Sequence, residues 1–299
     1  MFLSSLDFKS GADFGYNYGI SAKHMSLPSR EIVISPKTFG VIDLAEIIRF
    51  RELFYIFSWR DIKVRYKQTL LGVIWVIFQP LVTTLIFTVF FGNLAKIPSG
   101  DMPYPLFVLT GLVFWNYFSN SVTHAANSMV ENESIIKKVY FPKIILPLSS
   151  LLTGFIDFLI NLSLLFLFAI ATGHIPNLKI LYLLPFSLLV TIFSSAGLGL
   201  FLASINVKYR DVRYILPFFI QILLFISPVI YPLSILSPSH KIYMAFNPMS
   251  GAVEAARGIF SGTPPDFSLM IVSAFSSLLI LFTGFIYFSK TERFFADIV

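Results

Sequence analysis

The sequence predicts an all-α polytopic membrane protein with six transmembrane helices. Three observations support this: the composition, the length of the uncharged segments and the uneven distribution of Lys and Arg. Of 299 residues, 56% are hydrophobic and only 13% are charged, whereas soluble domains contain about 25% charged residues. The mean hydropathy is +0.78. This composition is typical of a chain whose surface largely faces lipid.

Six long segments lack charged residues, with one exception. The first covers residues 68–95, 28 residues in all, and about 20 apolar residues suffice to cross the bilayer core. The exception is Asp157, inside the third segment. It either contributes to a path or subunit interface, or is satisfied by a neighbouring helix, with Asn161 one turn away as a nearby polar group. The expected spans are approximately 71–91, 104–123, 146–170, 180–204, 212–231 and 268–288.

The positive charges indicate the orientation. Of the 22 Lys and Arg residues, 18 fall in the N-terminal segment, the loops after the second and fourth spans, and the C-terminal tail. Lys and Arg accumulate on the cytoplasmic side of spans, so we expect a multi-pass protein of the inner (plasma) membrane with both termini cytoplasmic. The pI of about 9.4 then reflects topology. No nucleic-acid partner is expected, because the charges are divided among several loops.

Two regions precede the first span. Residues 1–43 form a polar N-terminal tail, in which Met25 is a second candidate start. Residues 44–67 are predicted to form an amphipathic helix in the cytoplasmic interface of the membrane; the alternative is a plain basic flank. Residues 68–299 are then the six-helix transmembrane domain. Four basic residues fall within roughly 60° of the helix circumference, namely Arg49, Arg60, Lys63 and Lys67.

Two loops on the basic side contain apolar and aromatic residues that a solvated loop does not need. The first reads ENESIIKKVYFPKIILP, residues 131–147, and the second reads NVKYRDVRYI, residues 206–215. A short helix that exposes apolar side chains favours docking into the groove of a partner. The alternative is that both loops only carry topology-determining charges, with incidental aromatics.

The segment of residues 227–266, from the end of the fifth span to the start of the sixth, contains six prolines. Proline interrupts helices, and an interrupted helix is tolerated at membrane depth where protein or water satisfies the freed backbone. We therefore predict short re-entrant or periplasmic gate helices over residues 232–262, with a simple external loop as the alternative. Glu254 and Arg257 are spaced to pair on one of these helices. The expected gate residues are Tyr231, Tyr243, Asn247, Glu254 and Arg257.

Motifs for catalysis and nucleotide binding are missing from the sequence. It contains no G-x-x-x-x-G-K-[ST], no H-E-x-x-H and no cysteine, and its four histidines are scattered. We therefore expect no catalytic residues, no metal site and no cofactor in this chain. One intramembrane carboxylate is too little for a proton relay, so a transporter of this kind would draw its energy from another subunit.

Seven motifs occur in order along the chain: WRDIKVRYKQTLLGVIWVIFQP, FGNLAKIPSGDMPYPLFVLTGLVFWNYF, KKVYFPKIILPLSSLLTGFIDF, NVKYRDVRYILPF, SPVIYPLSIL, NPMSGAVEAARGIFSG and ERFFADIV. Together they resemble the membrane-spanning permease subunit of polysaccharide-exporting ABC transporters, the type-2 permeases of O-antigen, capsule or teichoic-acid export. The resemblance covers about residues 30–299.

This resemblance implies the partners. They are a second copy of the chain, membrane lipids, a lipid-linked polysaccharide and two ATPase subunits that bind ATP and Mg. It also implies that the loops at 131–142 and 206–214 are cytoplasmic coupling helices that dock on the ATPases. ATP binding would close the pair of ATPase subunits, and the coupling helices would transmit this closure to the spans. The residues expected to transmit it are Ile135, Lys138, Tyr140, Phe141, Tyr209, Arg210 and Asp211.

The abundance of aromatic residues, with 34 Phe, 13 Tyr and 3 Trp, bears on the cargo. Aromatic faces suit sugar rings, and a sliding polymer needs contacts weak enough to release. The alternative is that these side chains form interfacial belts or lipid-facing packing. The residues expected along a translocation path are Trp75, Phe78, Phe87, Tyr104, Phe107, Phe114, Trp115 and Tyr117.

The leading functional hypothesis is export of an O-antigen-like, lipid-linked polysaccharide, driven by ATP hydrolysis in a separate subunit. One alternative is an ABC exporter of a small amphiphile or drug. A distant alternative is a membrane-embedded glycan-modifying enzyme, which needs a carboxylate or base near the membrane surface. No paired acidic motif is present in the external loops. Neither the sugar polymer nor its lipid carrier can be identified from the sequence.

Overall fold

The computed structural model describes residues 44–67, 72–209, 211–262, 265–292 and 295. All of them belong to one compact unit, residues 39–299. Every regular element in this part of the chain is helical, which confirms the all-α prediction. The predicted tail, residues 1–43, and the predicted coupling residue Arg210 lie outside the described residues.

Thirteen helical elements follow one another in the described chain. Two of them are not α-helices: η1 is a π-helix and η2 is a 3-10 helix. Their bounds are α1 Leu44–Arg49, α2 Arg51–Lys67, α3 Gly72–Phe87, η1 Thr88–Leu94, α4 Tyr104–Glu131, α5 Glu133–Ile136, α6 Ile145–Ala171, α7 Ile180–Lys208, α8 Val212–Ile226, η2 Leu233–Ile235, α9 Pro238–Ala245, α10 Pro248–Arg257 and α11 Phe267–Thr291.

A helix is found at the position of each of the six expected spans. Four helical stretches are long and apolar enough to cross a membrane: Ile74–Leu94, Ile145–Ala171, Ile180–Lys208 and Phe267–Thr291. Of the other two, α8 is apolar but has only 15 residues, and α4 has 28 residues but is more polar. The chain is thus a multi-pass membrane protein, and the number of six crossings stays a prediction.

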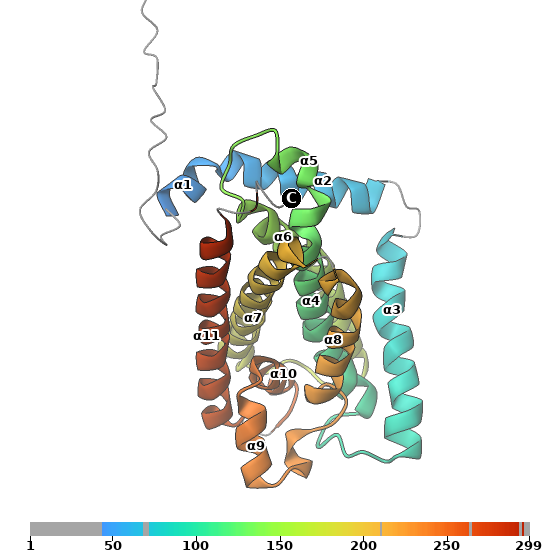
Figure 1. Cartoon of the computed structure of the whole chain (residues 1–299). Helices are drawn as coiled ribbons and strands as arrows, with labels where there is room; N and C mark the ends of the chain where they lie inside the picture. The colour runs from blue at the N-terminus through green and yellow to red at the C-terminus, as the bar shows by residue number, and fades with distance from the viewer. Residues whose placement is uncertain (1–43, 68–71, 210, 263–264, 293–294, 296–299) are drawn as a thin grey trace, which may run out of the picture. The chain divides into compact units, whose positions relative to one another are not determined.

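The long helices α4, α6, α7 and α11 pack side by side (Figure 1), with the most extensive contacts between α7 and its neighbours α11 and α4. Two glycines let α7 and α11 approach closely. A Cβ on Gly197 or Gly284 would run into the backbone of the opposite helix, which is the packing that small residues allow inside membranes. By contrast, α3 contributes little: 11% of its apolar stretch is buried, against 56% for α7.

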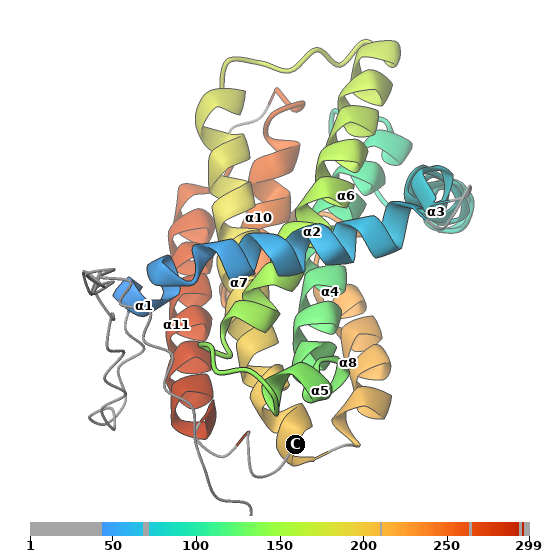
Figure 2. The same ribbon diagram turned by 90° about the horizontal axis from the view of Figure 1, so that it is seen from above.

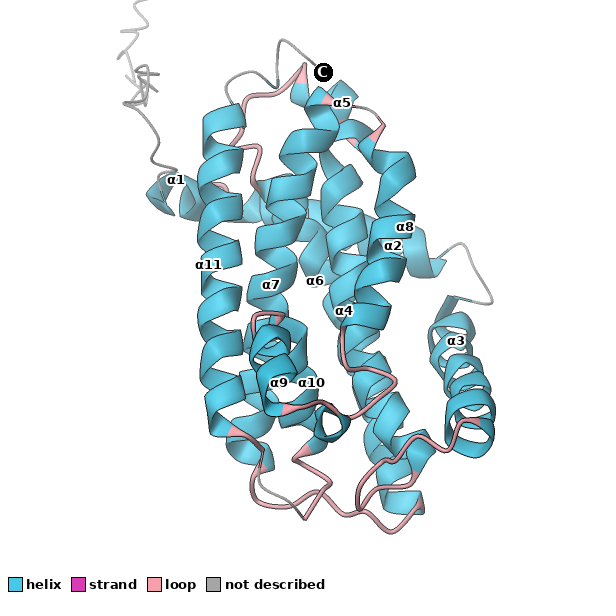
Figure 3. Cartoon of the chain, turned by 60° about the horizontal axis from the view of Figure 1, so that its bottom comes forward, coloured by secondary structure: helices cyan, strands magenta, loops and turns pink. Residues whose placement is uncertain are grey.

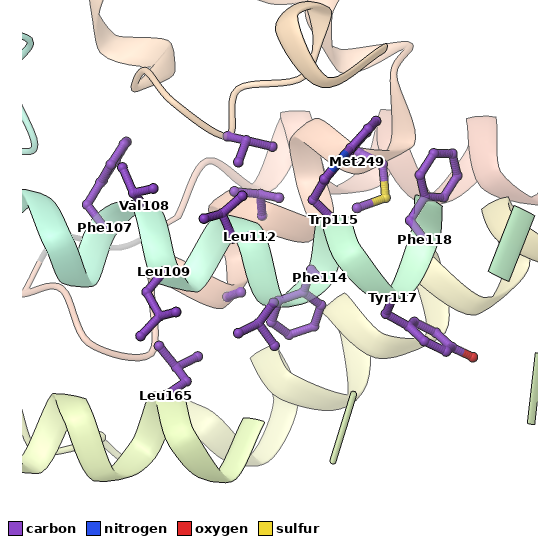
Figure 4. Packing of buried hydrophobic residues seen from close by; sticks show 14 of the residues in the cluster. Phe107, Val108, Leu109, Leu112, Phe114, Trp115, Tyr117, Phe118, Leu165 and Met249 are labelled. Atoms are coloured by element: carbon purple, nitrogen blue, oxygen red, sulfur yellow. The ribbon is translucent and has the colours of Figure 1, made fainter. Parts of the chain in front are cut away.

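The core of these helices centres on α4. Leu109 and Phe114 are fully buried, and Figure 4 shows Leu165 of α6 facing Leu109. The ring of Phe114 meets that of Phe158 on α6 edge to face, with centroids 5.2 Å apart. Lipid tails are as apolar as leucine, so close van der Waals packing of this kind is what holds such helices together.

The predicted helix over 44–67 is in fact two helices, α1 and α2, separated by a turn at Phe50. The backbone N–H groups of Leu53 and Phe54 both donate to the carbonyl oxygen of Phe50, at 3.0 and 3.2 Å. Seen from above, α2 lies across the ends of the long helices (Figure 2). We call this end of the molecule, which also carries α5, the α2 end; α9 and α10 lie at the opposite end (Figure 1).

Two further predictions about helix ends need correction. First, α8 ends at Ile226 and not at 231, because Ser227 precedes a proline and adopts an extended conformation with ψ 142°. Second, no separate coupling helix forms among the described residues of 206–214. Residues up to Lys208 continue α7, Tyr209 is extended with φ −129° and ψ 99°, and α8 begins at Val212.

Candidate functional site

The first predicted coupling loop combines buried and exposed residues. It consists of the four-residue helix α5 and the segment that leads to α6. Phe141 is only 3% exposed and Ile135 is half-buried. Tyr140 is 61% exposed, and Lys138 is exposed as well. The loop is therefore anchored from within and presents an aromatic and a cationic side chain on its surface.

The second predicted coupling segment is the bend between α7 and α8. Tyr209 and Asp211 are exposed there, and Arg210 lies outside the described residues. The bend follows a well-fixed end of α7, because buried Asn206 donates its Nδ2 to the carbonyl oxygen of Ala126 on α4 at 2.9 Å. The surface at this bend is thus tied directly to α4.

Beneath the first loop lies a buried apolar cluster, which we call the α2-end cluster. Within it the ring of Phe141 packs against the ring of Phe57 on α2, with centroids 5.7 Å apart. The cluster joins α2, α4, the first coupling loop, α6, α7 and α11, so a displacement of the loop meets the ends of all these helices. Its buried members are Phe57, Met129, Ile136, Phe141, Ile144, Ile145, Leu146, Leu200, Ala203, Val207, Phe288 and Phe295.

Asp157 is bound by two residues of α2. Its Oδ2 lies 2.5 Å from Arg65 Nη2, and its Oδ1 accepts a hydrogen bond from the hydroxyl of Tyr66. Burial, and then the bond to Asp157, raise the pKa of Tyr66 above its usual value, so this hydroxyl keeps its proton and donates. Asp157 is therefore a carboxyl satisfied by a neighbouring helix. Asn161, expected nearby as a polar group, does not pair with it.

A polar cleft of about 520 Å³ opens beside this network, between α2, α4 and α6. Its two guanidinium groups are balanced by two carboxylates, and Arg60 Nη2 lies 2.8 Å from Asp61 Oδ1. The lining residues are Arg60, Asp61, Val64, Arg65, His124, Ser128, Glu131, Asn132, Ser150 and Thr153. In the described part of the chain no three His, Cys, Asp or Glu side chains come together as metal ligands.

The basic residues predicted for the interfacial helix lie mostly on its surface. Arg49, Lys63 and Lys67 are exposed, and Arg60 is half-buried. Lys63 Nζ lies 5.7 Å from the ring centroid of Trp59, which places a cation over an exposed aromatic side chain. A pairing of this kind suits the boundary between water and lipid.

The predicted path residues fall into two groups. Those on α3 lie on its open side: Trp75 is 58% and Phe78 is 51% exposed, with ring centroids 5.9 Å apart. Phe87 is half-buried and meets Phe91 edge to face. Those on α4 are at most 8% exposed and pack inside this chain; they are Tyr104, Phe107, Phe114, Trp115 and Tyr117.

Trp115 also lines a hollow of about 280 Å³ between α4, α7, α8, α10 and α11. Four aromatic side chains contribute to its wall, and Figure 4 shows Trp115 and Phe118 on the side of α4 that faces Met249 of α10. The polar groups are few: Asn247 Nδ2 donates to Ser227 Oγ at 2.9 Å. The lining residues are Trp115, Phe118, Ser194, Leu198, Phe219, Leu223, Ile226, Ser227, Phe246, Asn247, Pro248 and Ile280.

At the other end of the molecule, a buried arginine joins three segments. Arg257 is 4% exposed; its Nη2 donates to the carbonyl oxygen of Val229 at 2.8 Å and its Nε to that of Phe107 at 3.3 Å. Gly111 leaves room for it, since a Cβ there would lie 3.2 Å from Nη2. The expected ion pair with Glu254 is not formed among the described residues, because the guanidinium points towards α4 and its Nε and Nη2 donate to backbone carbonyls.

The remaining gate residues take different positions. Asn247 Oδ1 accepts from the backbone N–H of Met249 at 3.0 Å and so caps α10. The hydroxyl of Tyr231 donates to the carbonyl oxygen of Ile226 at 3.0 Å, while Tyr243 is 74% exposed on α9. Glu254 is half-buried. Figure 3 shows α9 and α10 at the end opposite to α2, and α10 packs against α4, α7 and α11.

Sequence reasoning missed one contact at the α2 end. The backbone N–H of Lys143 donates to Glu292 Oε1 at 2.8 Å, and Lys143 Nζ donates to the carbonyl oxygen of Glu292 at 3.1 Å. The two residues are 149 positions apart, so no local spacing indicates this pairing. The only hint is that both sit in motifs that carry the family resemblance.

Comparisons with known proteins match this architecture. The model of the family described as ABC-2 type transporter matches residues 52–261. An O-antigen export system permease protein RfbA of Myxococcus xanthus is 29% identical over 255 residues, 83% of this chain and 96% of its own length. A namesake from Klebsiella pneumoniae is 24% identical, with 83% and 95% covered. The polysialic acid transport protein KpsM of Escherichia coli is 25% identical, with 78% and 91% covered.

Proposed function

Because the chain belongs to the ABC-2 type transporter family, we propose that it is the channel-forming subunit of an exporter that moves a lipid-linked, O-antigen-like polysaccharide across the inner membrane. The family is a transporter family, and the chain is a transport subunit rather than an enzyme. In this proposal ATP and Mg are bound, and ATP is hydrolysed, in a partner subunit.

The observation that carries the proposal is the match along most of the chain to permeases that export O-antigen and polysialic acid. The names of these relatives state O-antigen export and polysialic acid transport. The family model, which matches residues 52–261, covers α2, both candidate coupling loops and the candidate gate with α9 and α10.

The hollow lined by Trp115, Phe118, Phe219 and Phe246 supports a carbohydrate cargo. Aromatic faces pack against the C–H groups of sugar rings, and the single amide of Asn247 offers a hydrogen bond at its edge. Each of these contacts is weak, so a polymer can bind at many positions and still move along the path. In this view Trp115 is the path residue on α4, while Trp75 and Phe78 contribute from α3.

The charge distribution supports both termini on the cytoplasmic side. Phe57, near the beginning of the described chain, and Phe295, near its end, belong to the same cluster. The exposed basic residues Arg49, Lys63 and Lys67 lie at this same α2 end. Since Lys and Arg accumulate on the cytoplasmic side, we assign the α2 end to the cytoplasm, with six crossings between it and the hairpin of α9 and α10.

The partners in this proposal are a second copy of the chain and two ATPase subunits. The exposed surface at Tyr140 and Tyr209 would receive the ATPases. Closure of the ATPases on ATP would press on the first coupling loop, and Phe141 would pass the displacement to Phe57 and so to α2. A switch of the cluster to a second packing arrangement would then open or close the path, because packed cores move between discrete states.

Deletion of the gene tests the proposal in cells. We expect long glycan to disappear from the surface and lipid-linked polymer to accumulate inside, with both effects reversed by the intact gene. Unchanged surface glycan would contradict a polysaccharide cargo and would favour the small-amphiphile alternative. A lipid-linked glycan of altered structure, rather than altered location, would favour a glycan-modifying enzyme.

A further inference from the structure

We propose that Glu292 and Phe295 form a clamp that positions the part of the first coupling loop between α5 and α6, residues 137–144, on the α2-end cluster. The coupling part of this inference rests on the proposed function, whereas the clamp itself is a property of this chain alone. Neither residue lines the hollow beside Trp115, so the role we assign to them is one of positioning.

The first component of the clamp is the carboxylate of Glu292. Its Oε1 accepts the backbone N–H of Lys143 at 2.8 Å, and a hydrogen bond to a charged acceptor is stronger than a neutral one. The bond holds the main chain of the loop and not merely a side chain. The ammonium group of Lys143 donates a second hydrogen bond, from Nζ to the backbone carbonyl oxygen of Glu292 at 3.1 Å. Two hydrogen bonds, both donated by Lys143 and accepted by Glu292, therefore join the same pair of residues.

The second component is aromatic. Phe295 is fully buried, and its ring meets that of Phe288 on α11 edge to face, with centroids 5.3 Å apart. Lys143 Nζ lies 5.8 Å from the Phe295 ring centroid. Phe295 thus lies in the same cluster as the loop, against Phe288 and near Lys143, and its buried side chain holds it there.

The position of the clamp within the loop gives it a mechanical consequence. Tyr140 is exposed and Ile144 is buried, so the chain passes from surface to core within four residues. Pro142 has no N–H with which to stabilise a local turn. Lys143, the next residue, is held by Glu292. A push received at Tyr140 therefore meets a backbone that is held at Lys143, between the cluster members Phe141 and Ile144, and it is passed inward instead of being lost in loop motion.

Site-directed spin labelling tests the clamp without any assumption about cargo. The natural chain has no cysteine, so a single nitroxide label can be placed at Val139, which is 53% exposed, in the full-length protein in lipid nanodiscs. We expect E292A to make this label more mobile, seen as narrower lines in its EPR spectrum. E292Q should stay nearer to the wild type, because the amide oxygen still accepts from the Lys143 N–H.

A second label at Leu178, which is 86% exposed at the opposite end, is the matched control. Its spectrum should be the same in all variants. Unchanged mobility at Val139 in E292A would overturn the clamp, as would equal mobility in E292A and E292Q, since that would assign the effect to charge. If E292A does not fold, E292D decides, because its shorter side chain withdraws the carboxylate from Lys143: unchanged mobility in E292D overturns the clamp.

The coupling role is tested with the same variants in the complete complex with its ATPase subunits. We expect E292A to lower the polysaccharide exported per ATP hydrolysed by roughly 2- to 30-fold, the range for residues that carry coupling between sites, with E292Q retaining more than E292A. A mobile loop with normal export per ATP would overturn the coupling role. If the wild-type complex exports no polysaccharide, the proposed function fails, while the label result still decides the clamp.

Discussion

Phe141 and Phe57 lie ring against ring, with centroids 5.7 Å apart and a tilt of 47°, although one belongs to the loop after α5 and the other to α2. Both are at most 5% exposed. This contact joins the surface that would receive an ATPase to the helix that lies across the ends of the long helices. It is the contact through which, in our proposal, closure of the ATPase subunits on ATP is transmitted to α2 and the translocation path.

Truncation of Tyr140 should separate ATP hydrolysis from transport. We expect Y140A to lower the transport-coupled ATPase activity several-fold while the complex still assembles, because this 61% exposed ring contributes contact area to the partner and little to the fold. Replacing an exposed side chain changes stability by about 0.5 kcal/mol at most. The matched control is Y182A, which removes a tyrosine that is 47% exposed on α7. Normal coupling in Y140A would remove this loop from the interface.

The pairing of Arg65 with Asp157 should stabilise the chain more than the neighbouring Arg60–Asp61 pair. In the first pair the carboxylate side chain is 8% exposed and the guanidinium 30%, against 31% and 39% in the second. We expect a coupling free energy of about 1–3 kcal/mol from a double-mutant cycle with R65A and D157A, and below about 1 kcal/mol from R60A and D61A. Chemical unfolding in detergent measures both cycles. Equal values would show that α2 is not fastened to α6 in this way.

Removal of the Arg257 side-chain charge should loosen the hairpin of α9 and α10. R257M leaves the carbonyl oxygens of Val229 and Phe107 without their donor, and each unsatisfied buried group costs about 1–3 kcal/mol. We therefore expect a loss of about 2–4 kcal/mol in the free energy of unfolding, read as a lower thermal midpoint. K96M, at an exposed lysine of the same end, should have no effect. A thermal midpoint for R257M equal to that of the wild type would contradict the role assigned to the arginine.

Truncation of Trp75 should affect export rather than stability. This ring is 58% exposed on α3, so W75A leaves no cavity in the core, and we expect the thermal midpoint to stay within about 2 °C of the wild type. Export of polymer should fall several-fold if α3 faces the path. F275A, at a phenylalanine of α11 that is 66% exposed, is the control on another face. Equal export in W75A and F275A would assign Trp75 to lipid-facing packing.

The orientation can be read from two single cysteines in the otherwise cysteine-free chain. We expect a cysteine at Tyr243 to react with an impermeant reagent added to intact cells, because Tyr243 is 74% exposed on α9. A cysteine at exposed Lys137 should react only after the cells are opened. The reverse pattern of labelling would overturn the assignment of the α2 end to the cytoplasm.

Much of the fold could be predicted because membrane-spanning helices have a clear sequence signal, a long run of uncharged residues. Lipid tolerates few charges, so the uncharged run before Lys96 marks α3 and the run after Asp266 marks α11. The two misplaced helix ends have different causes, one local and one distant in sequence. The effect of Pro228 on Ser227 shortened α8, and the capture of Asn206 by α4 lengthened α7. The effect of Pro228 could be predicted from the sequence. The contact of Asn206 could not, because its partner Ala126 lies 80 residues away on α4.

The site was harder to predict, because its contacts join distant segments. Asp157 was noticeable in the sequence as a lone carboxylate within an expected span. Its partners Arg65 and Tyr66 were not, because they belong to a basic segment whose packing against α6 is seen only in the structure. Arg257 was expected to pair with its neighbour Glu254, since spacing along one helix was all the sequence offered. Tertiary packing instead gave it the backbone of Phe107 and Val229.

The most direct test of the account is transport by the purified complex. The chain and its ATPase partner would be reconstituted in liposomes with lipid-linked polysaccharide and supplied with ATP and Mg on the side of the ATPase. We expect polymer to become accessible to a glycan-cleaving enzyme on the opposite side, only with hydrolysable ATP. ATP-dependent movement of a small amphiphile without any movement of polymer, or ATP hydrolysis without either, would contradict the central claim.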